Sequence, residues 1–179
     1  MPNKIQLLTE ELATPIGELV VIYDEEGRLR ATDWTNYHER MHRLLARHYG
    51  EDNFTLTPAP NPSRLAAAIA TYFAGDLHAI DSLPVATVGT AFQKSVWQAL
   101  RFIPAGQTIS YGELAIQLGK PAAVRAVGLA NGANPIGVVV PCHRVIGADG
   151  SLTGYGGGLE RKRWLLHHEM QNQLLAVSF

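Results

Sequence analysis

The sequence predicts an α+β protein, in which a small N-terminal antiparallel sheet with flanking helices precedes a mainly helical half that contains a helix-turn-helix. Apolar segments of strand length fill the first third of the 179 residues, helix caps and helical periodicity dominate after residue 90, and a stretch between them shows neither. With 46% hydrophobic and 17% charged residues, the chain can bury a sizeable core. We expect a scaffold domain with its linker at 1–88 and a functional domain at 89–179.

The predicted sheet rests on three short apolar segments, residues 5–12, 18–23 and 28–34. The sequence Asp-Glu-Glu-Gly at 24–27 lies between the last two and is typical of a hairpin turn. Antiparallel pairing is the simplest arrangement for strands this close in the chain.

Two helices and a linker follow. Asn36 is expected to cap a helix that ends at Tyr49, and Ser63 to cap one that ends at Gly75. Residues 76–89 lack a helical period and are predicted to be a linker.

The second half begins with a helix opened by Thr90. Ser110 and Glu113 have the spacing of a capping box, and the helix that they begin stops at Gly119. A further helix over residues 122–131 follows closely, which predicts a helix-turn-helix.

The helix at 122–131 carries almost no bulky side chains apart from Arg125. Small residues let a helix approach another surface closely. That surface is either DNA or the neighbouring helices, and the spacing alone leaves both open.

Cys142 is the only cysteine, which excludes an intramolecular disulfide, a cysteine-cluster zinc site and a dithiol redox couple. The apolar run at 136–140 predicts a buried extended segment that ends beside Cys142 and His143. A cysteine next to an imidazole is a candidate nucleophile, although neighbours in an extended chain point apart and need a sharp turn or a bridging water. The alternative is a small buried hydrophobic residue.

The formal net charge of −1 conceals a division of the chain. Residues 1–84 hold 7 basic and 12 acidic side chains, and residues 85–179 hold 8 basic and 4 acidic ones. Net charges of −5 and +4 indicate that only the second half meets a polyanion, and that nonspecific binding to nucleic acid is modest.

An ordered set of motifs covers nearly all of residues 90–170. It consists of Thr-Ala-Phe-Gln at 90–93, Ser-Tyr-Gly-Glu-Leu-Ala at 110–115, Arg-Ala-Val-Gly at 125–128, Asn-Pro at 134–135, Pro-Cys-His-Arg-Val-Ile-Gly at 141–147, Gly-Tyr-Gly-Gly-Gly at 154–158 and Trp-Leu-Leu-His-His-Glu at 164–169. In these motifs the chain resembles the O6-alkylguanine-DNA alkyltransferases, the methylated-DNA–protein-cysteine methyltransferases.

The resemblance implies DNA repair in which the cysteine irreversibly takes an alkyl group from O6 of guanine, or from O4 of thymine, once per molecule. By position, Cys142 is the acceptor, His143 the base that deprotonates it through a water, and Glu169 the carboxylate that orients the imidazole. Tyr111 donates a proton towards the departing guanine, and Asn134 holds the thiol region. The implied helical domain is winged-helix-like.

The resemblance also implies how DNA is held. The partner is double-stranded DNA with alkylated bases, entered from the minor groove, with the damaged nucleotide flipped out and Arg125 filling the gap. Val124 is bulkier than the alanine expected there. The DNA-binding residues implied are Arg125, Ala123, Val124, Ala126, Gly128 and Asn131, and those that border the base pocket are Val145, Tyr155, Gly156, Gly157 and Gly158.

We expect no cofactor and no metal, since the structural zinc of some relatives is held partly by cysteines that this chain lacks. We also expect a monomer without an obligate protein partner. No apolar stretch approaches the roughly 20 residues of a membrane span, and two glutamates at 10–11 interrupt a signal-peptide pattern. A cytoplasmic location follows.

A competing motif is His-Glu-Arg-Met-His at 38–42, which satisfies the H-E-x-x-H pattern of zinc peptidases. Leu45 stands where the longer form of that motif has a glycine. In a continuous helix His48 lies about 15 Å along the axis from His38 and roughly 80° around it, too far to share an ion. An amphipathic surface helix is the favoured interpretation.

Two further classes remain as alternatives. A helix-turn-helix regulator explains the basic half but not Cys142 beside His143, and it would bind undamaged, specific sites. A cysteine acyltransferase or hydrolase uses the same pair, but it turns over repeatedly and needs an oxyanion hole that no motif supplies.

Overall fold

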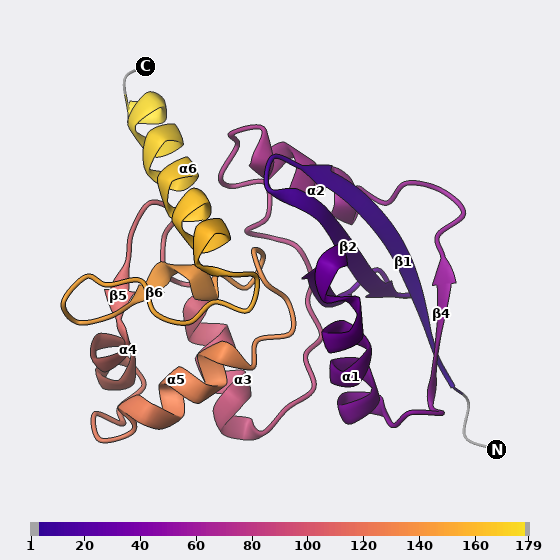
Figure 1. Cartoon of the computed structure of the whole chain (residues 1–179), viewed down its shortest axis with the longest axis horizontal. Helices are drawn as coiled ribbons and strands as arrows, with labels where there is room; N and C mark the ends of the chain where they lie inside the picture. Colours follow the sequence, from indigo (N-terminus) through magenta and orange to yellow (C-terminus); the bar gives the residue numbers. More distant parts are fainter. Residues whose placement is uncertain (1–3, 178–179) are drawn as a thin grey trace.

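The computed structural model describes residues 4–177, in which a four-stranded sheet lies beside a group of helices (Figure 1). The sheet has the order β3-β2-β1-β4. Its first three strands pair antiparallel, as expected, and β4 lies parallel to β1. The strands are β1 (Ile5–Thr14), β2 (Gly17–Asp24), β3 (Leu29–Trp34) and β4 (Phe54–Pro58).

Strand β4 was not predicted from the sequence. Its first four residues alternate apolar and threonine side chains, its fifth is a proline, and Phe54 is buried. This is the period-2 pattern of a strand, but it is short and the proline beside it favours a loop.

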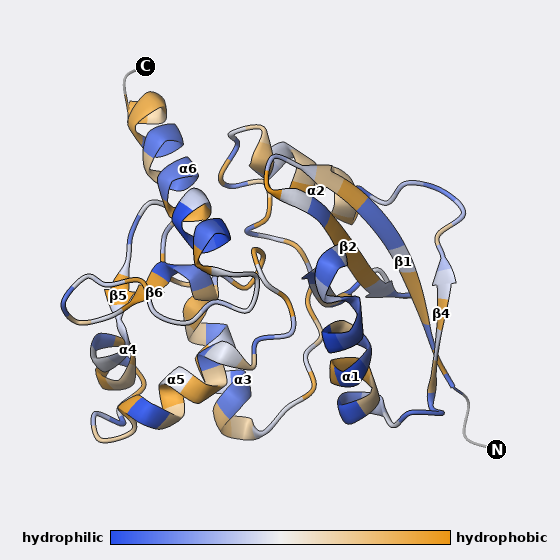
Figure 2. Ribbon diagram, in the orientation of Figure 1, coloured by the Kyte–Doolittle hydropathy of each residue, from blue (hydrophilic) through white to orange (hydrophobic). Residues whose placement is uncertain are grey.

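The sheet is covered on both faces, so successive residues of β2 are all buried from Leu19 onward. Leu19 and Val21 face the main core, to which α2 (Arg64–Phe73) contributes. Val20 and Ile22 face a smaller core under α1 (His38–Tyr49). In Figure 2 most of β2 is apolar, β1 has a polar stretch in its middle, and α1 carries polar residues over most of its length.

The expected cap of the first helix is wrong. Residues Thr35–Tyr37 already form a 3-10 turn, η1, that continues into α1, so Asn36 lies inside the helical run and Tyr37 occupies the cap position without a side-chain bond. Ser63 does cap α2, since its hydroxyl accepts from the backbone N–H of Ala66 at 3.1 Å.

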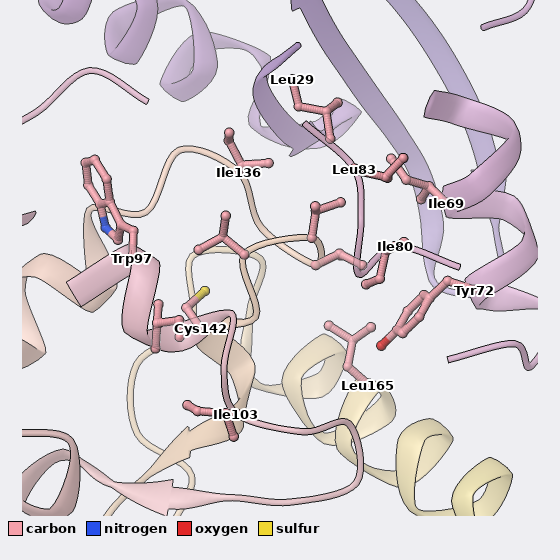
Figure 3. Packing of buried hydrophobic residues seen from close by; sticks show 14 of the residues in the cluster. Leu29, Ile69, Tyr72, Ile80, Leu83, Trp97, Ile103, Ile136, Cys142 and Leu165 are labelled. Atoms are coloured by element: carbon pink, nitrogen blue, oxygen red, sulfur yellow. The ribbon is translucent and has the colours of Figure 1, made fainter. Parts of the chain in front are cut away.

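The linker is irregular, as predicted, but it is packed rather than loose. Leu77, Ile80 and Leu83 are buried in the main core (Figure 3). Its end runs along the edge of β3, where the N–H of Leu29 donates to the carbonyl of Pro84 at 2.8 Å. The same core includes residues from both halves of the chain, which fixes the helices relative to the sheet.

The capping box predicted at Ser110 and Glu113 is present, and Thr90, expected to open a helix, forms a second one with Gln93. Thr90 caps α3 (Ala91–Leu100), and Ser110 with Glu113 caps α4 (Tyr111–Gln117). The next helix, α5 (Val124–Gly132), begins two residues later than expected, with Ala123 as its cap. Trp97 of α3 donates its indole N–H to the carbonyl of Ala130 at 2.8 Å and joins α3 to α5.

The apolar run at 136–140 is buried but not extended. It folds into successive turns, with Val138 at φ +70° and the N–H of Val140 donating to the carbonyl of Ile136. Asn134 supports these turns, because its amide donates to Val140 and accepts from Ile136. A side chain that bonds nearby backbone competes with a strand ladder, which explains the wrong expectation.

The rest of the chain completes the helical half. Residues Cys142–Arg144 form a 3-10 turn, η2, followed by β6 (Val145–Ile146), which pairs parallel with β5 (Ile109–Ser110). The last helix, α6 (Leu159–Val177), extends beyond the body of the molecule (Figure 1). Within residues 4–177, the helices are too short or too polar to cross a bilayer.

Candidate functional site

Cys142 lies where the two halves of the molecule meet. It opens the η2 turn and is 9% exposed. A cavity of about 570 Å³ reaches it, lined from the sheet side by Trp34 and from the helical half by Asn134 and Tyr155. The cysteine is therefore buried but faces a space that a small group can occupy.

His143 is fully buried and is oriented by one hydrogen bond. Its Nε2 lies 2.8 Å from Oε1 of Glu169 on α6. With the carboxylate ionised, Nε2 carries the proton of that bond, and Nδ1 is left as the acceptor nitrogen. Nδ1 is buried and has no partner within residues 4–177. The imidazole is thus arranged to receive a proton at Nδ1.

Glu169 is the centre of the polar network. Its Oε1 also accepts from Nη2 of Arg144 at 2.8 Å and from the hydroxyl of Tyr72 at 2.7 Å, and its Oε2 accepts from Nε of Arg144 at 3.0 Å. Burial alone raises the pKa of Glu169, but His143 and Arg144 outweigh it and hold that pKa well below its ordinary value. The group is therefore an ionised carboxylate at neutral pH.

The thiol of Cys142 is protonated at rest. Burial raises its pKa, while a hydrogen bond from Asn134 and the charge of Lys162 act in the opposite direction without overcoming burial. A nucleophilic thiolate therefore has to be formed when a reaction partner arrives, which requires a nearby base.

The glycine-rich loop after β6 closes one wall of the cavity. A Cβ on Gly157 would lie 2.5 Å from the indole nitrogen of Trp34, so only glycine fits there. Arg40 of α1 donates to the carbonyl of Gly156 and pairs with Asp33. Of the expected pocket residues, Tyr155, Gly156 and Gly157 line the cavity, whereas Val145 and Gly158 do not.

The residues expected to contact DNA divide into two groups. Val124, Arg125 and Ala126 are exposed on α5, and Ala123 and Gly128 are half-buried. Asn131 is buried instead, and its amide nitrogen lies 3.4 Å from the carbonyl of Cys142. Asn131 therefore does not share the exposed face of Val124, Arg125 and Ala126.

Tyr111 is separated from the Glu169 network. It occupies the first turn of α4, packs against Gly128 of α5, and donates its hydroxyl to the carbonyl of Thr153 at 3.0 Å. That bond places the phenol beside the loop that leads to the glycine run.

The H-E-x-x-H residues lie on α1, where Met41 and Leu45 form the buried stripe. His42 is exposed and its ring lies 5.8 Å from that of Phe54. In the part of the chain that the structure describes, three His, Cys, Asp or Glu side chains do not gather anywhere into a metal-binding group.

Comparison with protein families accounts for both halves of the chain. Residues 91–171 match the DNA-binding domain of 6-O-methylguanine DNA methyltransferase, and residues 7–87 match the ribonuclease-like domain of the same family. The chain belongs to this methyltransferase family.

Individual members of the family agree over nearly the whole length. The methylated-DNA–protein-cysteine methyltransferase of Salmonella typhimurium is 58% identical over 165 residues, which is 92% of this chain and 96% of that protein. A crystal structure of Mycobacterium tuberculosis OGT in complex with DNA superposes with a TM-score of 0.76 at 42% identity, covering 94% of each chain. The O6-methylguanine-DNA methyltransferase of Pyrococcus kodakaraensis gives 0.69 at 29% identity, covering 91% of this chain and 98% of that one.

Three side chains that support the site were not predicted from the sequence. They are Tyr72, Arg144 and Lys162, all of them buried. Lys162 precedes Leu165 and Glu169 by three and seven residues, so it falls on the buried stripe of α6. A charged residue on an apolar stripe is a usable signal. Tyr72 carries none, since a tyrosine on a buried helix face is ordinary core.

Proposed function

We propose that the protein repairs DNA by irreversible, stoichiometric transfer of an alkyl group from O6-alkylguanine, and from O4-alkylthymine, to Cys142. The observation that carries the proposal is that the only cysteine of the chain faces a cavity and is followed by a histidine whose buried Nδ1 has no partner among residues 4–177. Membership of the methyltransferase family supplies the substrate class.

The reaction forms a bond between Sγ of Cys142 and the alkyl carbon and breaks the bond from that carbon to O6. His143 takes the thiol proton at Nδ1 through a water, and Glu169 stabilises the imidazolium through Nε2. Tyr111 supplies a proton to the departing guanine, which is otherwise a poor leaving group. Asn134 positions the thiol by holding the turns that precede it.

The target carbon lies inside a duplex and has to be brought to Cys142. We propose that α5 enters the minor groove, that Ala123, Val124, Ala126 and Gly128 allow close approach, and that Arg125 fills the gap left by the flipped nucleotide. Minor-groove edges discriminate poorly between bases, which suits a protein that acts wherever damage occurs. Asn131 contributes from the interior, beside the carbonyl of Cys142.

We propose that Tyr155, Gly156 and Gly157 form the wall of the base pocket, and that Gly158 and Val145, which do not line the cavity, support it from outside. Backbone amides of the glycine run are available to the base, and the absence of side chains lets the purine approach. The product thioether is stable, because the site holds no nucleophile strong enough to break a carbon–sulfur bond. One molecule therefore repairs one lesion, without a cofactor or metal.

We further propose that residues 1–88 act as scaffold and residues 89–179 carry DNA binding and transfer, and that the protein works in the cytoplasm as a monomer. The packing of the linker into the common core supports a scaffold role, because it places Trp34 and Arg40 against the glycine-rich wall.

The decisive experiment is the intact mass of the protein after incubation with excess duplex DNA that carries one O6-methylguanine. The proposal expects the mass of one methylene group per molecule, saturating at one, with peptide mapping that places it on Cys142. Undamaged duplex of the same sequence is the control. Unchanged mass in folded protein would contradict the proposal and favour a lesion-binding or regulatory role.

A further inference from the structure

The carboxylate that orients His143 receives a hydrogen bond from the opposite half of the molecule. Tyr72 lies in the last turn of α2, and its hydroxyl donates to Oε1 of Glu169 at 2.7 Å across 97 residues of sequence. The same oxygen accepts from Nε2 of His143 at 2.8 Å. The phenol and the imidazole thus share one acceptor atom.

The position of the Tyr72 hydroxyl is tightly fixed. The side chain is 0% exposed. Its ring packs edge-on against Phe73 and against His168, with centroids 5.3 Å apart in each case. The backbone carbonyl of Tyr72 accepts from Nε2 of His168 at 2.8 Å, so α2 and α6 are joined at two points. Figure 3 shows the tyrosine reaching from α2 towards α6, beside Leu165.

A donor that shares a carboxylate oxygen changes what that oxygen offers to its other partners. Each hydrogen bond to the ionised form stabilises it and lowers its basicity. The carboxylate therefore stabilises a neighbouring imidazolium less strongly when a phenol is bonded to the same atom. In a buried network these effects are larger than in water.

We propose that Tyr72 is a positioning residue for alkyl transfer. Its hydroxyl fixes Glu169 from the scaffold half and weakens the stabilisation that this carboxylate gives to the His143 imidazolium. The inference rests on the proposed function, because it assigns Tyr72 a part in preparing the base of that reaction. It also gives the N-terminal half a direct electrostatic link to the reacting centre.

Three other groups lie around this network, and one of them, Arg144, shares Oε1 with Tyr72. Arg144, on the same turn, contacts both oxygens of Glu169 and donates to the carbonyl of Ile103. Lys162 of α6 acts on Cys142 and is bonded to backbone carbonyls. The N–H of Gly106, at 3.3 Å, reaches Oε2 rather than Oε1. Tyr72 differs from them in being an uncharged side chain of the N-terminal half that donates to Oε1.

The test is the pH dependence of the single-turnover transfer rate in the full chain, compared between wild type and Tyr72→Phe. Without the hydroxyl, Oε1 holds the imidazolium proton more strongly, so the midpoint of the acidic limb shifts upward by roughly half a pH unit, about a threefold loss of rate below the midpoint. A merely structural role lowers the rate equally at every pH. An unmoved midpoint would overturn the proposal.

The matched control is Tyr23→Phe, which removes a buried hydroxyl beside another carboxylate, Glu10, away from the site. Its acidic midpoint should equal that of wild type. If Tyr72→Phe fails to fold, 3-fluorotyrosine placed at position 72 serves instead. Its more acidic hydroxyl is a stronger donor and should move the midpoint downward, and an unchanged midpoint would again count against the proposal.

A readout without DNA separates this inference from the proposed function. The ring nitrogens of His143 can be titrated by NMR in unreacted protein, wild type and variant, whether or not transfer occurs. An upward shift in Tyr72→Phe supports the link from Tyr72 even if wild type transfers no alkyl group. If wild type and variant both transfer the alkyl group but His143 titrates identically in the two, the role of Tyr72 is refuted while the proposed function stands.

Discussion

Lys162 of α6 donates a hydrogen bond of 2.6 Å to the backbone carbonyl of Val145, the residue that follows the η2 turn. Its Nζ also donates to the carbonyl of Thr153 at 3.1 Å. A fully buried ammonium thus joins β6 to the start of the glycine-rich wall. Burial lowers the pKa of Lys162, and the neighbouring Cys142 partly offsets this.

Replacing Lys162 with methionine should loosen that wall. The change keeps most of the volume but leaves buried carbonyls without a donor, at a cost of about 2 kcal/mol in the free energy of unfolding. The thiol of Cys142 also loses a favourable charge, so alkylation by iodoacetamide at neutral pH should slow. Denaturant unfolding and thiol reaction rates check both, with Lys94→Met, an exposed lysine of α3, as the control. Unfolding curves that coincide with wild type would show that the hydrogen bonds from Lys162 to these carbonyls do not contribute to stability.

Cys142→Ser should abolish transfer and keep DNA binding. A hydroxyl is far less acidic than a thiol, and His143 cannot generate an alkoxide under the same conditions. Affinity for duplex with one O6-methylguanine should stay within about twofold of wild type, because α5 is unaltered. Fluorescence anisotropy and intact mass measure the two properties. Full repair by the serine variant would refute the proposed chemistry.

Arg125→Ala should slow transfer from duplex DNA more than transfer from a single strand. The side chain is exposed on α5 and is proposed to replace the flipped nucleotide, a step that costs a few kcal/mol only in a paired helix. We expect about a tenfold slower duplex reaction. Arg163→Ala, on α6, removes an equally charged exposed side chain as the control. Equal slowing on both substrates would assign Arg125 to general phosphate contact instead.

Acid should weaken the fold partly through Glu169. Its pKa is lowered in the folded protein relative to an ordinary 4.5, so the unfolded chain binds the proton first. The stabilisation is complete above about pH 5 and is lost as the pH falls, with a slope of up to about 1.4 kcal/mol per pH unit from this group. Urea unfolding from pH 7 to 3 should show a shallower decline in Glu169→Gln.

At neutral pH the same glutamine variant should be less stable by roughly 3–5 kcal/mol, since Arg144 is left buried without a counter-charge. The gap from wild type should therefore narrow on acidification. Glu160→Gln, an exposed carboxylate of α6, should follow the wild-type curve. Parallel curves for wild type and Glu169→Gln would mean that other carboxylates govern acid unfolding.

Removing the Ser110 hydroxyl should destabilise the protein by about 1 kcal/mol, the usual cost of an N-cap. Ser110 accepts from the N–H of Glu113 at 3.1 Å and places Tyr111 in the first turn of α4. Thermal unfolding of Ser110→Ala measures the loss. Thr71→Ala removes an exposed hydroxyl from the interior of α2 and should change little. A loss of thermal stability in Thr71→Ala but not in Ser110→Ala would contradict the assignment of Ser110 as a stabilising N-cap.

The sequence predicted those parts of the molecule that rest on local rules. The caps at Ser63, Thr90 and Ser110 and the hairpin of the first strands follow from a few adjacent residues, and the structure confirms them. The cap at Asn36 failed because a 3-10 turn begins before it. The position of the boundary near residue 88 stays a prediction.

Nonlocal contacts explain what the sequence missed. The bond from Tyr72 to Glu169 spans 97 residues, and β4, whose alternating pattern is too short to predict a strand, is held by its parallel neighbour β1. The turns around Val138 depend on Thr32 of β3, whose hydroxyl donates to the carbonyl of Gly137 at 2.7 Å. The motif around Cys142 identified the acceptor, but only the folded chain locates the groups that surround its base.

Because the chain has one thiol, a thiol titration can report how many molecules have reacted. Since Cys142 is the only cysteine, the number of thiols that a denatured sample yields to a colorimetric reagent equals the number of unspent molecules. In a purified preparation the ratio of that count to total protein gives the unspent fraction, and the remainder is the fraction consumed, without a labelled oligonucleotide. In proteins with additional cysteines, the thiols that do not react with the lesion add a constant background to this measurement.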